Sequence, residues 1–224
     1  MFNQTIALFR YQLLGILNRK LLVVLIAIAM AAFLFSRFVA ELAIINSDSI
    51  ALASLADLLR YSLMLMLVIS LCHQVSQDYE LSQFERLLAM PISRSQYVVA
   101  QFLVLLAQAL VFVTPMFLIM LALSDFSIAV YWSLAVLLEL LLVGQIAVLA
   151  IISLEKLPVA VVFTITLYLL ARAVPYVDLI FTQSTEYYQD ETGFQFAESL
   201  FIWLQYLFPG INAFAQNNAL FERH

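Results

Sequence analysis

Long apolar runs, rather than alternating polar and apolar positions, dominate the chain. A helix needs about 20 mostly apolar residues to cross a bilayer. Runs of about this length cover residues 21–40, 50–72, 97–123, 128–152 and 157–177. They are rich in Leu, Ile, Val, Ala and Phe and lack the alternation expected of barrel strands. The pattern predicts an all-α membrane protein, one transmembrane domain over 1–224 with five to six transmembrane helices.

The first residues show a different, amphipathic pattern. Phe2, Ile6, Phe9, Leu13 and Leu17 are spaced by three or four residues, so they share one face of a helix. We expect residues 1–19 to form an interfacial helix lying in the headgroup plane before the first span. A plain lead-in with no special role is the alternative.

The pattern weakens after the fifth run. Residues 178–198 carry five acids and no base, and the apolar stretch 199–215 is broken by Pro209 and Gly210. We expect 178–216 to form an outward, re-entrant region, with its acids as surface charge; binding of a cationic or metal-bearing partner is the alternative. Residues 199–215 are either a short last span, or a sixth span is missing from this chain. The Pro-Gly break favours the second interpretation.

Composition excludes several classes of protein. The 224 residues are 65% hydrophobic and 11% charged, against about 45–50% and about 25% in soluble domains. The single cysteine, Cys72, can form no internal disulfide, and no metal-ligand spacing occurs. Histidine occurs only at 73 and 224, which argues against a membrane enzyme, and we expect no catalytic residue. The phosphate-loop motif is absent, so any ATP must be bound by another chain.

The distribution of Lys and Arg predicts the orientation. Six basic residues lie before the first span or in the loops after the second and fourth, whereas only Arg37 and Arg172 lie on the other side, near span ends where they can snorkel. Short cytoplasmic loops carry the excess of basic residues. The N-terminus and the 77–96 loop are therefore expected in the cytoplasm.

A polar island, "QDYELSQFERLLAMPISRSQY", separates the second and third runs. Its apolar positions Leu81, Phe84 and Leu88 fall on one helix face, and Pro91 ends the helix because it cannot donate a backbone hydrogen bond. The spacing predicts a short cytoplasmic helix that presents one face to a soluble partner. A solvated loop that merely joins two spans is equally compatible with this spacing.

The island resembles the segment before the third span of type-2 ABC exporter permeases. The match is "FERLLAMPISRSQYVVAQF", in which Glu85, Leu87, Leu88, Pro91 and Arg94 occupy the corresponding places. The layout of the first five spans and the amphipathic lead-in extend the resemblance over most of residues 1–177. Haem-exporter-like permeases are similar in layout.

The resemblance implies a transmembrane permease subunit of an ATP-driven exporter in a bacterial cytoplasmic membrane. Two copies, or this chain and a related permease, would associate with ABC ATPase subunits that bind ATP and Mg; this chain itself would bind no cofactor. Other implied partners are membrane lipids and an extracytoplasmic protein, but no nucleic acid. The implied coupling helix touches the ATPase through Asp78, Glu80, Phe84, Glu85, Arg86, Leu88 and Met90. The interfacial helix would add Phe9, Arg10 and Arg19.

Five polar side chains interrupt the predicted spans. Asp57 and Arg60 lie one turn apart, so they can form an ion pair, either structural or on a dimer interface or export path. Gln101 and Gln108 share a face of the third span and either bond to a neighbouring helix or line a path. Glu139 has no partner nearby in the sequence and should face protein or water. An ion-coupled transporter or channel using Asp57, Arg60 and Glu139 is the alternative function.

Overall fold

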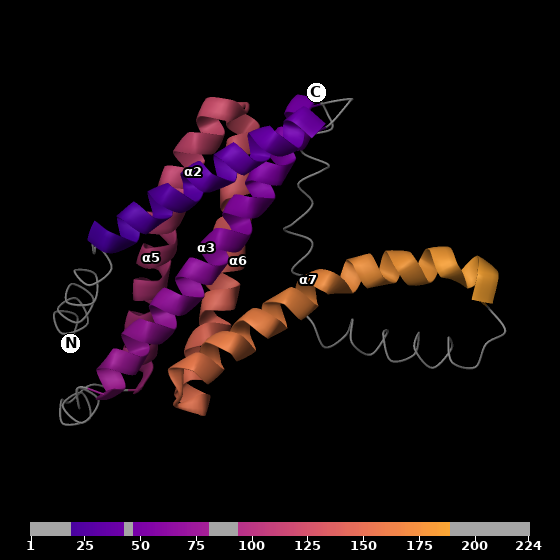
Figure 1. The fold of residues 1–224 in the computed structure, drawn as a ribbon. Helices are drawn as coiled ribbons and strands as arrows, with labels where there is room; N and C mark the ends of the chain where they lie inside the picture. The colour runs from indigo at the N-terminus through magenta and orange to yellow at the C-terminus, as the bar shows by residue number, and fades with distance from the viewer. Residues whose placement is uncertain (1–18, 43–46, 81–93, 189–224) are drawn as a thin grey trace.

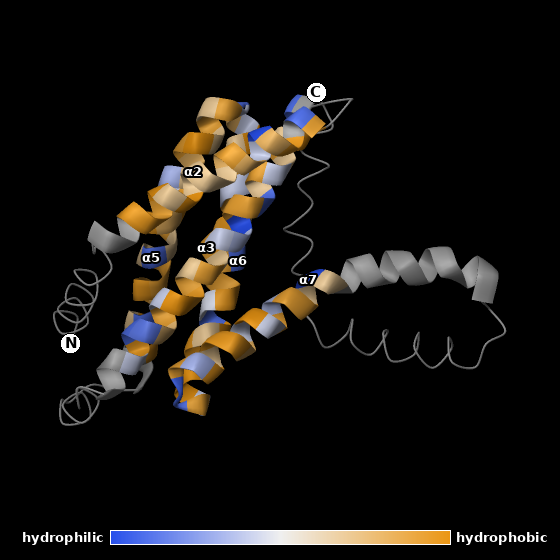
Figure 2. Cartoon of the chain, viewed as in Figure 1, coloured by the Kyte–Doolittle hydropathy of each residue, from blue (hydrophilic) through white to orange (hydrophobic). Residues whose placement is uncertain are grey.

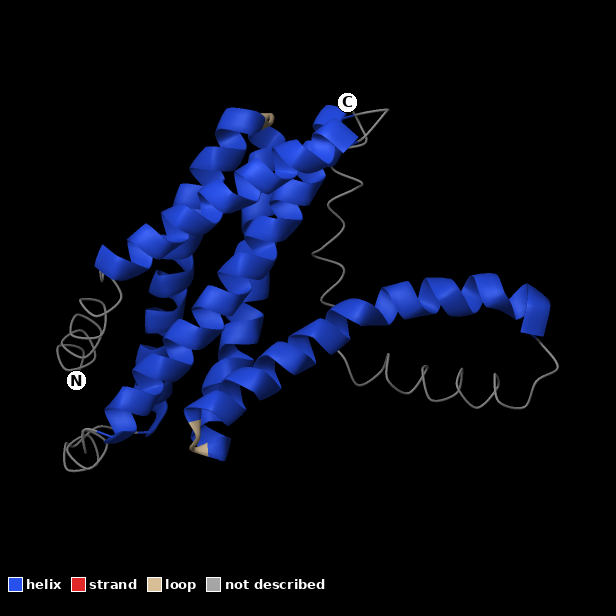
Figure 3. Cartoon of the chain, viewed as in Figure 1, coloured by secondary structure: helices blue, strands red, loops and turns tan. Residues whose placement is uncertain are grey.

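We describe the chain from a computed structural model, which defines residues 19–42, 47–80 and 94–188. Every regular element in these ranges is an α-helix (Figure 3). The helices are α2 (Arg19–Leu42), α3 (Ser47–Glu80), α5 (Arg94–Leu123), α6 (Phe126–Leu154) and α7 (Leu157–Tyr188). The predicted all-helical fold is thus confirmed for the described part of the chain.

Tight turns connect α5 to α6 and α6 to α7, and each of these pairs packs together. Ser124 ends α5, and both its N–H and its hydroxyl donate to the Met120 carbonyl, at 2.8 and 2.7 Å. Glu155 ends α6 in the left-handed conformation, at a φ of 55°. Its N–H donates to the Ile151 carbonyl, which closes the last turn. Figure 1 shows this turn and the end of α3 at one end of the bundle, opposite the α5–α6 turn.

Helix α3 packs against all four other helices. Its buried ridge repeats every four residues, which keeps the side chains on one face. The ridge consists of Leu59, Leu63, Leu67 and Leu71, each 0% exposed. Helix α6 supplies a matching buried stripe of Trp132, Val136 and Leu140. These two helices therefore form the centre of the bundle.

The outer faces of the helices are also apolar. Figure 2 shows hydrophobic colouring along most of the described length of the bundle. The large exposed side chains include Met30, Leu34, Val98, Leu149 and Val162. Apolar surface of this extent is rare in water but is expected where a helix faces lipid.

Three helices contain stretches long and apolar enough to cross a membrane: Asp48–Ser76, Val98–Leu123 and Phe126–Leu154. Helices α2 and α7 carry shorter apolar stretches, Val23–Val39 and Leu157–Ala173. The chain is therefore a multi-pass membrane protein.

Helices α5 and α6 approach closely at Gly144. A Cβ atom at this position would collide with the side chain of Leu105 on α5 and lie 3.2 Å from Leu71 on α3. Small residues allow such close approach between helices in membranes. The absence of a side chain at Gly144 is thus what allows Leu105 to occupy its present place.

Two predicted boundaries need correction. Helix α3 continues to Glu80, so Asp78 and Glu80 belong to the end of a long helix and not to a separate surface helix. Helix α7 is unbroken to Tyr188, so no helix ends near residue 177, and residues 178–188 of the expected re-entrant region continue the fifth helix. Three segments lie outside the described residues: 1–18 of the expected interfacial helix, 81–93, and 189–224, which includes the apolar stretch 199–215.

Candidate functional site

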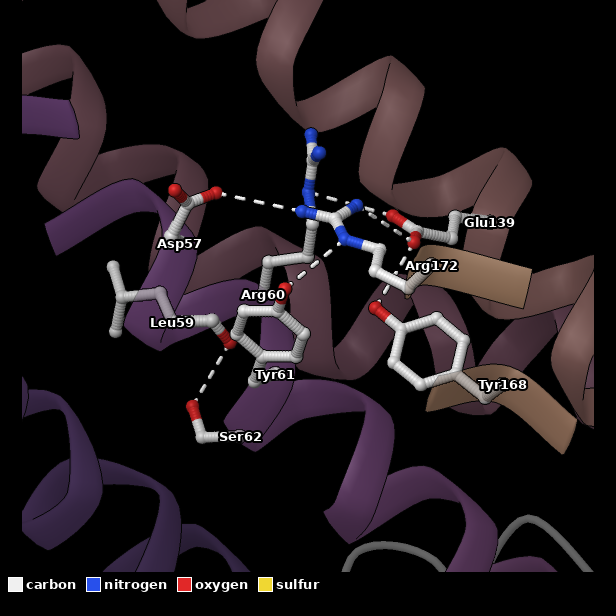
Figure 4. Close-up of polar contacts among 8 residues, drawn as sticks. All are labelled: Asp57, Leu59, Arg60, Tyr61, Ser62, Glu139, Tyr168 and Arg172. Carbon is white, nitrogen blue, oxygen red and sulfur yellow. Dashed lines mark hydrogen bonds and ion pairs between the residues drawn. The ribbon is translucent and has the colours of Figure 1, made fainter. Parts of the chain in front are cut away.

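Two acids, two arginines and two tyrosines from three helices meet in the bundle (Figure 4). Helix α3 contributes three of these six side chains, α6 contributes one and α7 contributes two. The group, called the charge network below, consists of Asp57, Arg60, Tyr61, Glu139, Tyr168 and Arg172. Its position within apolar helices makes it the candidate functional site, because ionisable residues inside membrane spans are costly and usually functional.

Glu139 is the centre of the charge network. Its side chain is fully buried, and its Oε2 lies 3.4 Å from Nε of Arg60. Its other oxygen, Oε1, lies 3.4 Å from Nη1 of Arg172 and accepts a hydrogen bond of 3.0 Å from the Tyr168 hydroxyl. One carboxylate thus connects α6 to both α3 and α7.

Arg172 connects the same helices from the α7 side. Its Nε donates to the Tyr61 hydroxyl at 3.1 Å, and its Nη2 lies 3.6 Å from Oδ1 of Asp57. The guanidinium also lies over the Tyr61 ring, 5.1 Å from the ring centroid, in the range of a cation–π contact. Helix α7 is therefore tied to α3 by a side chain that makes three different contacts there.

The formal charges within the network cancel, with two acids against two arginines. Pairing is required for Glu139 and its two arginines, because removing one member of a buried pair costs about 3–5 kcal/mol, whereas the side chain of Asp57 is 41% exposed. The pairs are nevertheless long, at 3.4–3.6 Å, compared with about 2.7–2.9 Å for well-formed charge-assisted hydrogen bonds. The opposite charges of the network therefore compensate one another, but at distances longer than those of strong hydrogen bonds.

The Arg60 guanidinium is the least satisfied part of the network. Arg60 is 0% exposed, and its Nε, Nη1 and Nη2 make no hydrogen bond within the described part of the chain. Figure 4 shows that this guanidinium extends away from the rings of Tyr61 and Tyr168. It forms an ion pair with Glu139, at 3.4 Å. Glu139 therefore compensates the charge of Arg60 from the α6 side.

The sequence placed Asp57, Arg60 and Glu139 correctly inside the spans but missed their partners on other helices. Asp57 pairs with Arg172, and Arg60 pairs with Glu139. Arg172 lies near the end of the apolar stretch Leu157–Ala173, as expected. The expectation that it snorkels is wrong, because it is 5% exposed and pairs with Glu139 and Asp57.

The two glutamines of α5 differ in their surroundings. Nε2 of Gln108 donates to Oγ of Ser70 on α3 at 2.6 Å, so this side chain bonds to a neighbouring helix. Gln101 is 6% exposed, and its amide atoms make no hydrogen bond to described residues. Neither glutamine is part of the charge network.

The other predicted site residues fall where side chains are not described. Asp78 and Glu80 end α3, and Arg19 begins α2. Phe9, Arg10, Phe84, Glu85, Arg86, Leu88 and Met90 lie outside the described residues. Among the residues that are described, no group of three or more His, Cys, Asp or Glu side chains is placed to hold a metal ion.

The whole chain was compared with known proteins. Comparison of the chain with protein families, with curated proteins and with solved structures finds no match in any of the three. The family of the chain is therefore not shown by these comparisons.

Proposed function

We propose that the chain is the transmembrane permease subunit of an ATP-driven ABC exporter. The observation that carries the proposal is the segment "FERLLAMPISRSQYVVAQF" and its place in the chain. It begins shortly after α3 ends at Glu80 and runs into α5, which begins at Arg94. Both flanking helices contain membrane-crossing stretches. In the permease family that this segment resembles, the ATPase-contacting helix occupies the same place.

Sidedness supports the same proposal. Arg86 and Arg94 lie within the motif, and Lys156 lies in the α6–α7 turn. Figure 1 shows the end of α3 and this turn at the same end of the bundle. Basic residues in short loops favour the cytoplasm, where a soluble ATPase is found. All five helices would then cross the inner membrane, α2 and α7 through their shorter apolar stretches, with the N-terminus inside.

The proposed work of the chain is mechanical. Phe84 and Leu88 would sit in a cleft of the ATPase, and Asp78, Glu80, Glu85 and Arg86 would make polar contacts around them. ATP and Mg would bind to the ATPase, and two permease chains would form the path between them. Movement of the coupling helix would pass directly into α3 and α5, the helices that flank it.

Affinity purification from native membranes tests the proposal. We expect an ATPase with a phosphate-loop motif to copurify with the chain, and the isolated chain to hydrolyse no ATP. Replacing Phe84 and Leu88 together by Asp should reduce the bound ATPase at least tenfold, because charge would enter an apolar contact. Phe126→Asp is the matched control, since Phe126 is 68% exposed at the opposite end of the bundle. Equal ATPase recovery with both variants would disprove the coupling contact.

The charge network favours a second candidate, an ion-coupled transporter or channel. Glu139 is a fully buried carboxylate between two arginines, a setting in which uptake of a proton changes the local charge by one unit. Proton flux into pyranine-loaded liposomes under an imposed potassium gradient tests this candidate. A flux that Glu139→Gln abolishes would support it, whereas a flux equal to that of empty liposomes would count against it.

A further inference from the structure

A crevice lies between α3, α6 and α7, next to the charge network. Its volume is about 240 Å³. The walls consist of Tyr61, Met64 and Val68 from α3, Val143 from α6, and Ile165 and Tyr168 from α7. None of these residues carries a formal charge, although the charged side chains of the network lie only one residue or one turn away.

The two tyrosines present carbon atoms to the crevice. The hydroxyl of Tyr61 accepts from Arg172, and the hydroxyl of Tyr168 donates to Glu139. Figure 4 shows both hydroxyls pointing toward the arginine and the glutamate. The rings meet edge to face, with centroids 6.2 Å apart. Together they separate the charged groups from the apolar crevice.

An apolar cavity of this size selects an apolar occupant. An engineered cavity of about 150 Å³ in another protein stays dry and binds benzene, because water finds no hydrogen-bond partner in it. The present crevice is larger and equally poor in free polar groups. It has room for the end of a hydrocarbon chain but not for a whole lipid.

The mouth of the crevice faces outward. Leu65 and Leu169 complete its lining and are 44% and 51% exposed. Ile69, one turn beyond Leu65, is 50% exposed. The inner walls are closed by contrast, since Met64, Val68 and Val143 are each at most 2% exposed. A chain that entered between Leu65 and Leu169 would reach side chains that bulk lipid cannot touch.

The depth of the crevice matches the ends of lipid chains. Val68 and Met64 precede Ser76, the end of the membrane-crossing stretch of α3, by eight and twelve positions. At a rise of about 1.5 Å per residue this is about 12–18 Å along the helix. Half of the hydrocarbon core of a bilayer is about 15 Å thick. At this depth the available neighbours are acyl chains, and neither headgroups nor water are expected.

We propose that this crevice binds the terminal part of a membrane-lipid acyl chain, which enters between Leu65 and Leu169 and lies against the rings of Tyr61 and Tyr168. The bound chain supports from one side the two tyrosines that hold Arg172 and Glu139 on the other. This site does not depend on what the protein transports.

Photolabelling of the full chain in phosphatidylcholine nanodiscs tests the proposal. The probe is a tracer phospholipid with a diazirine near the terminal methyl group of one chain, and labelled residues are identified by mass spectrometry. We expect label on the buried residues Met64 and Val143. Leu138, 42% exposed on α6, reports bulk lipid, and Met116, 1% exposed on α5, reports background. Labelling of Met64 and Val143 no higher than that of Met116 would overturn the proposal.

Matched variants test the route of entry. Leu169→Trp places a large ring at the mouth, on an exposed position that tolerates it, and should reduce labelling of Met64 at least fivefold. Leu138→Trp makes the same change on a lipid-facing position outside the crevice and should leave the labelling of Met64 unchanged. Unchanged labelling of Met64 in Leu169→Trp would refute entry at this mouth. Absence of label from Leu65 and Leu169 in the unmodified chain would show that a protein surface covers the crevice, and this result would also overturn the proposal.

Discussion

The two neighbours of α6 in the sequence are held to it in different ways. Against α5, α6 presents Gly144, and the contact is a close fit to the apolar side chain of Leu105. Against α7, α6 presents Glu139, which accepts from Tyr168 and pairs with Arg172. The contact of α6 with α5 thus depends on close apolar packing, and its contact with α7 depends on charged and hydrogen-bonded side chains.

This difference has a physical reason in a membrane. Lipid tails are as apolar as leucine, so apolar contact alone gives helices little reason to associate. A close fit at a small residue stabilises a helix pair through van der Waals contact. A polar contact between helices stabilises it through a hydrogen bond or ion pair that lipid tails cannot form. We infer that α5 can be displaced at modest cost, whereas separating α7 from α6 would leave charges in an apolar setting. The variants below test this comparison.

Glu139→Gln should have the largest effect. It removes the central negative charge and leaves Arg60 and Arg172 with only Asp57 as an acid in the network. Breaking a buried ion pair costs about 3–5 kcal/mol. We expect a loss of this size in the free energy of unfolding, measured by denaturant titration in mixed micelles. Glu155→Gln, at the C-cap of the same helix, is the control, since Glu155 is exposed. A loss for Glu139→Gln no larger than that for the control would show that the network does not hold the bundle.

Gly144→Ala should have a smaller effect, on the α5 side. The added Cβ would collide with the end of the Leu105 side chain. Overpacking of this kind costs about 1–3 kcal/mol, and the better helix propensity of Ala returns about 0.5–1 kcal/mol. We therefore expect a net loss of about 1 kcal/mol in the same titration.

Leu105→Val is the matched partner for Gly144→Ala, because it removes the colliding δ-carbons. In the double variant the cost of Gly144→Ala should disappear, which a double-mutant cycle measures as favourable coupling. Additive losses would mean that the Leu105 contact does not determine the fit between α5 and α6.

The helices could be predicted from the sequence, because each apolar run is a local property of the chain. The partners in the charge network could not. Asp57 and Arg60 lie three residues apart on α3, and this spacing indicated a pair within one helix. Glu139 and Arg172 lie on different helices, and no local sequence pattern predicts which faces of these helices pack together.

Arg172 shows how a partner on another helix changes an interpretation. It lies near the end of the apolar stretch Leu157–Ala173, a position that predicts a side chain at the membrane surface. Contacts with Tyr61 on α3 and Glu139 on α6 instead hold it inside the bundle. An arginine near the end of an apolar run, with an unpartnered acid in another run, is the signal that would have indicated this pair.

Tyr168→Phe should have a smaller effect than Gly144→Ala. It removes the hydrogen bond of 3.0 Å to Glu139 and keeps the ring that packs against Tyr61. Hydrogen bonds between helices in membranes contribute about 0.6 kcal/mol on average, and Arg172 still pairs with the same oxygen. We expect a loss near this average. In the Glu139→Gln background the effect should shrink, because the acceptor is no longer charged; an undiminished effect would show that the hydroxyl acts through another group.

The double variant Gln108→Leu with Ser70→Ala should have the smallest effect. It removes the hydrogen bond of 2.6 Å between α5 and α3. It also removes the buried Oε1 of Gln108, which has no hydrogen-bond partner among the described residues.

Replacing both members of a buried polar pair by apolar groups is often nearly neutral, whereas removing one leaves a buried group unsatisfied. We therefore expect a change within about 0.5 kcal/mol for the double variant and a larger loss for Ser70→Ala alone. If the double variant instead lost as much stability as Glu139→Gln, polar contacts would hold α5 as strongly as they hold α7, and the contrast between the two neighbours of α6 would fail.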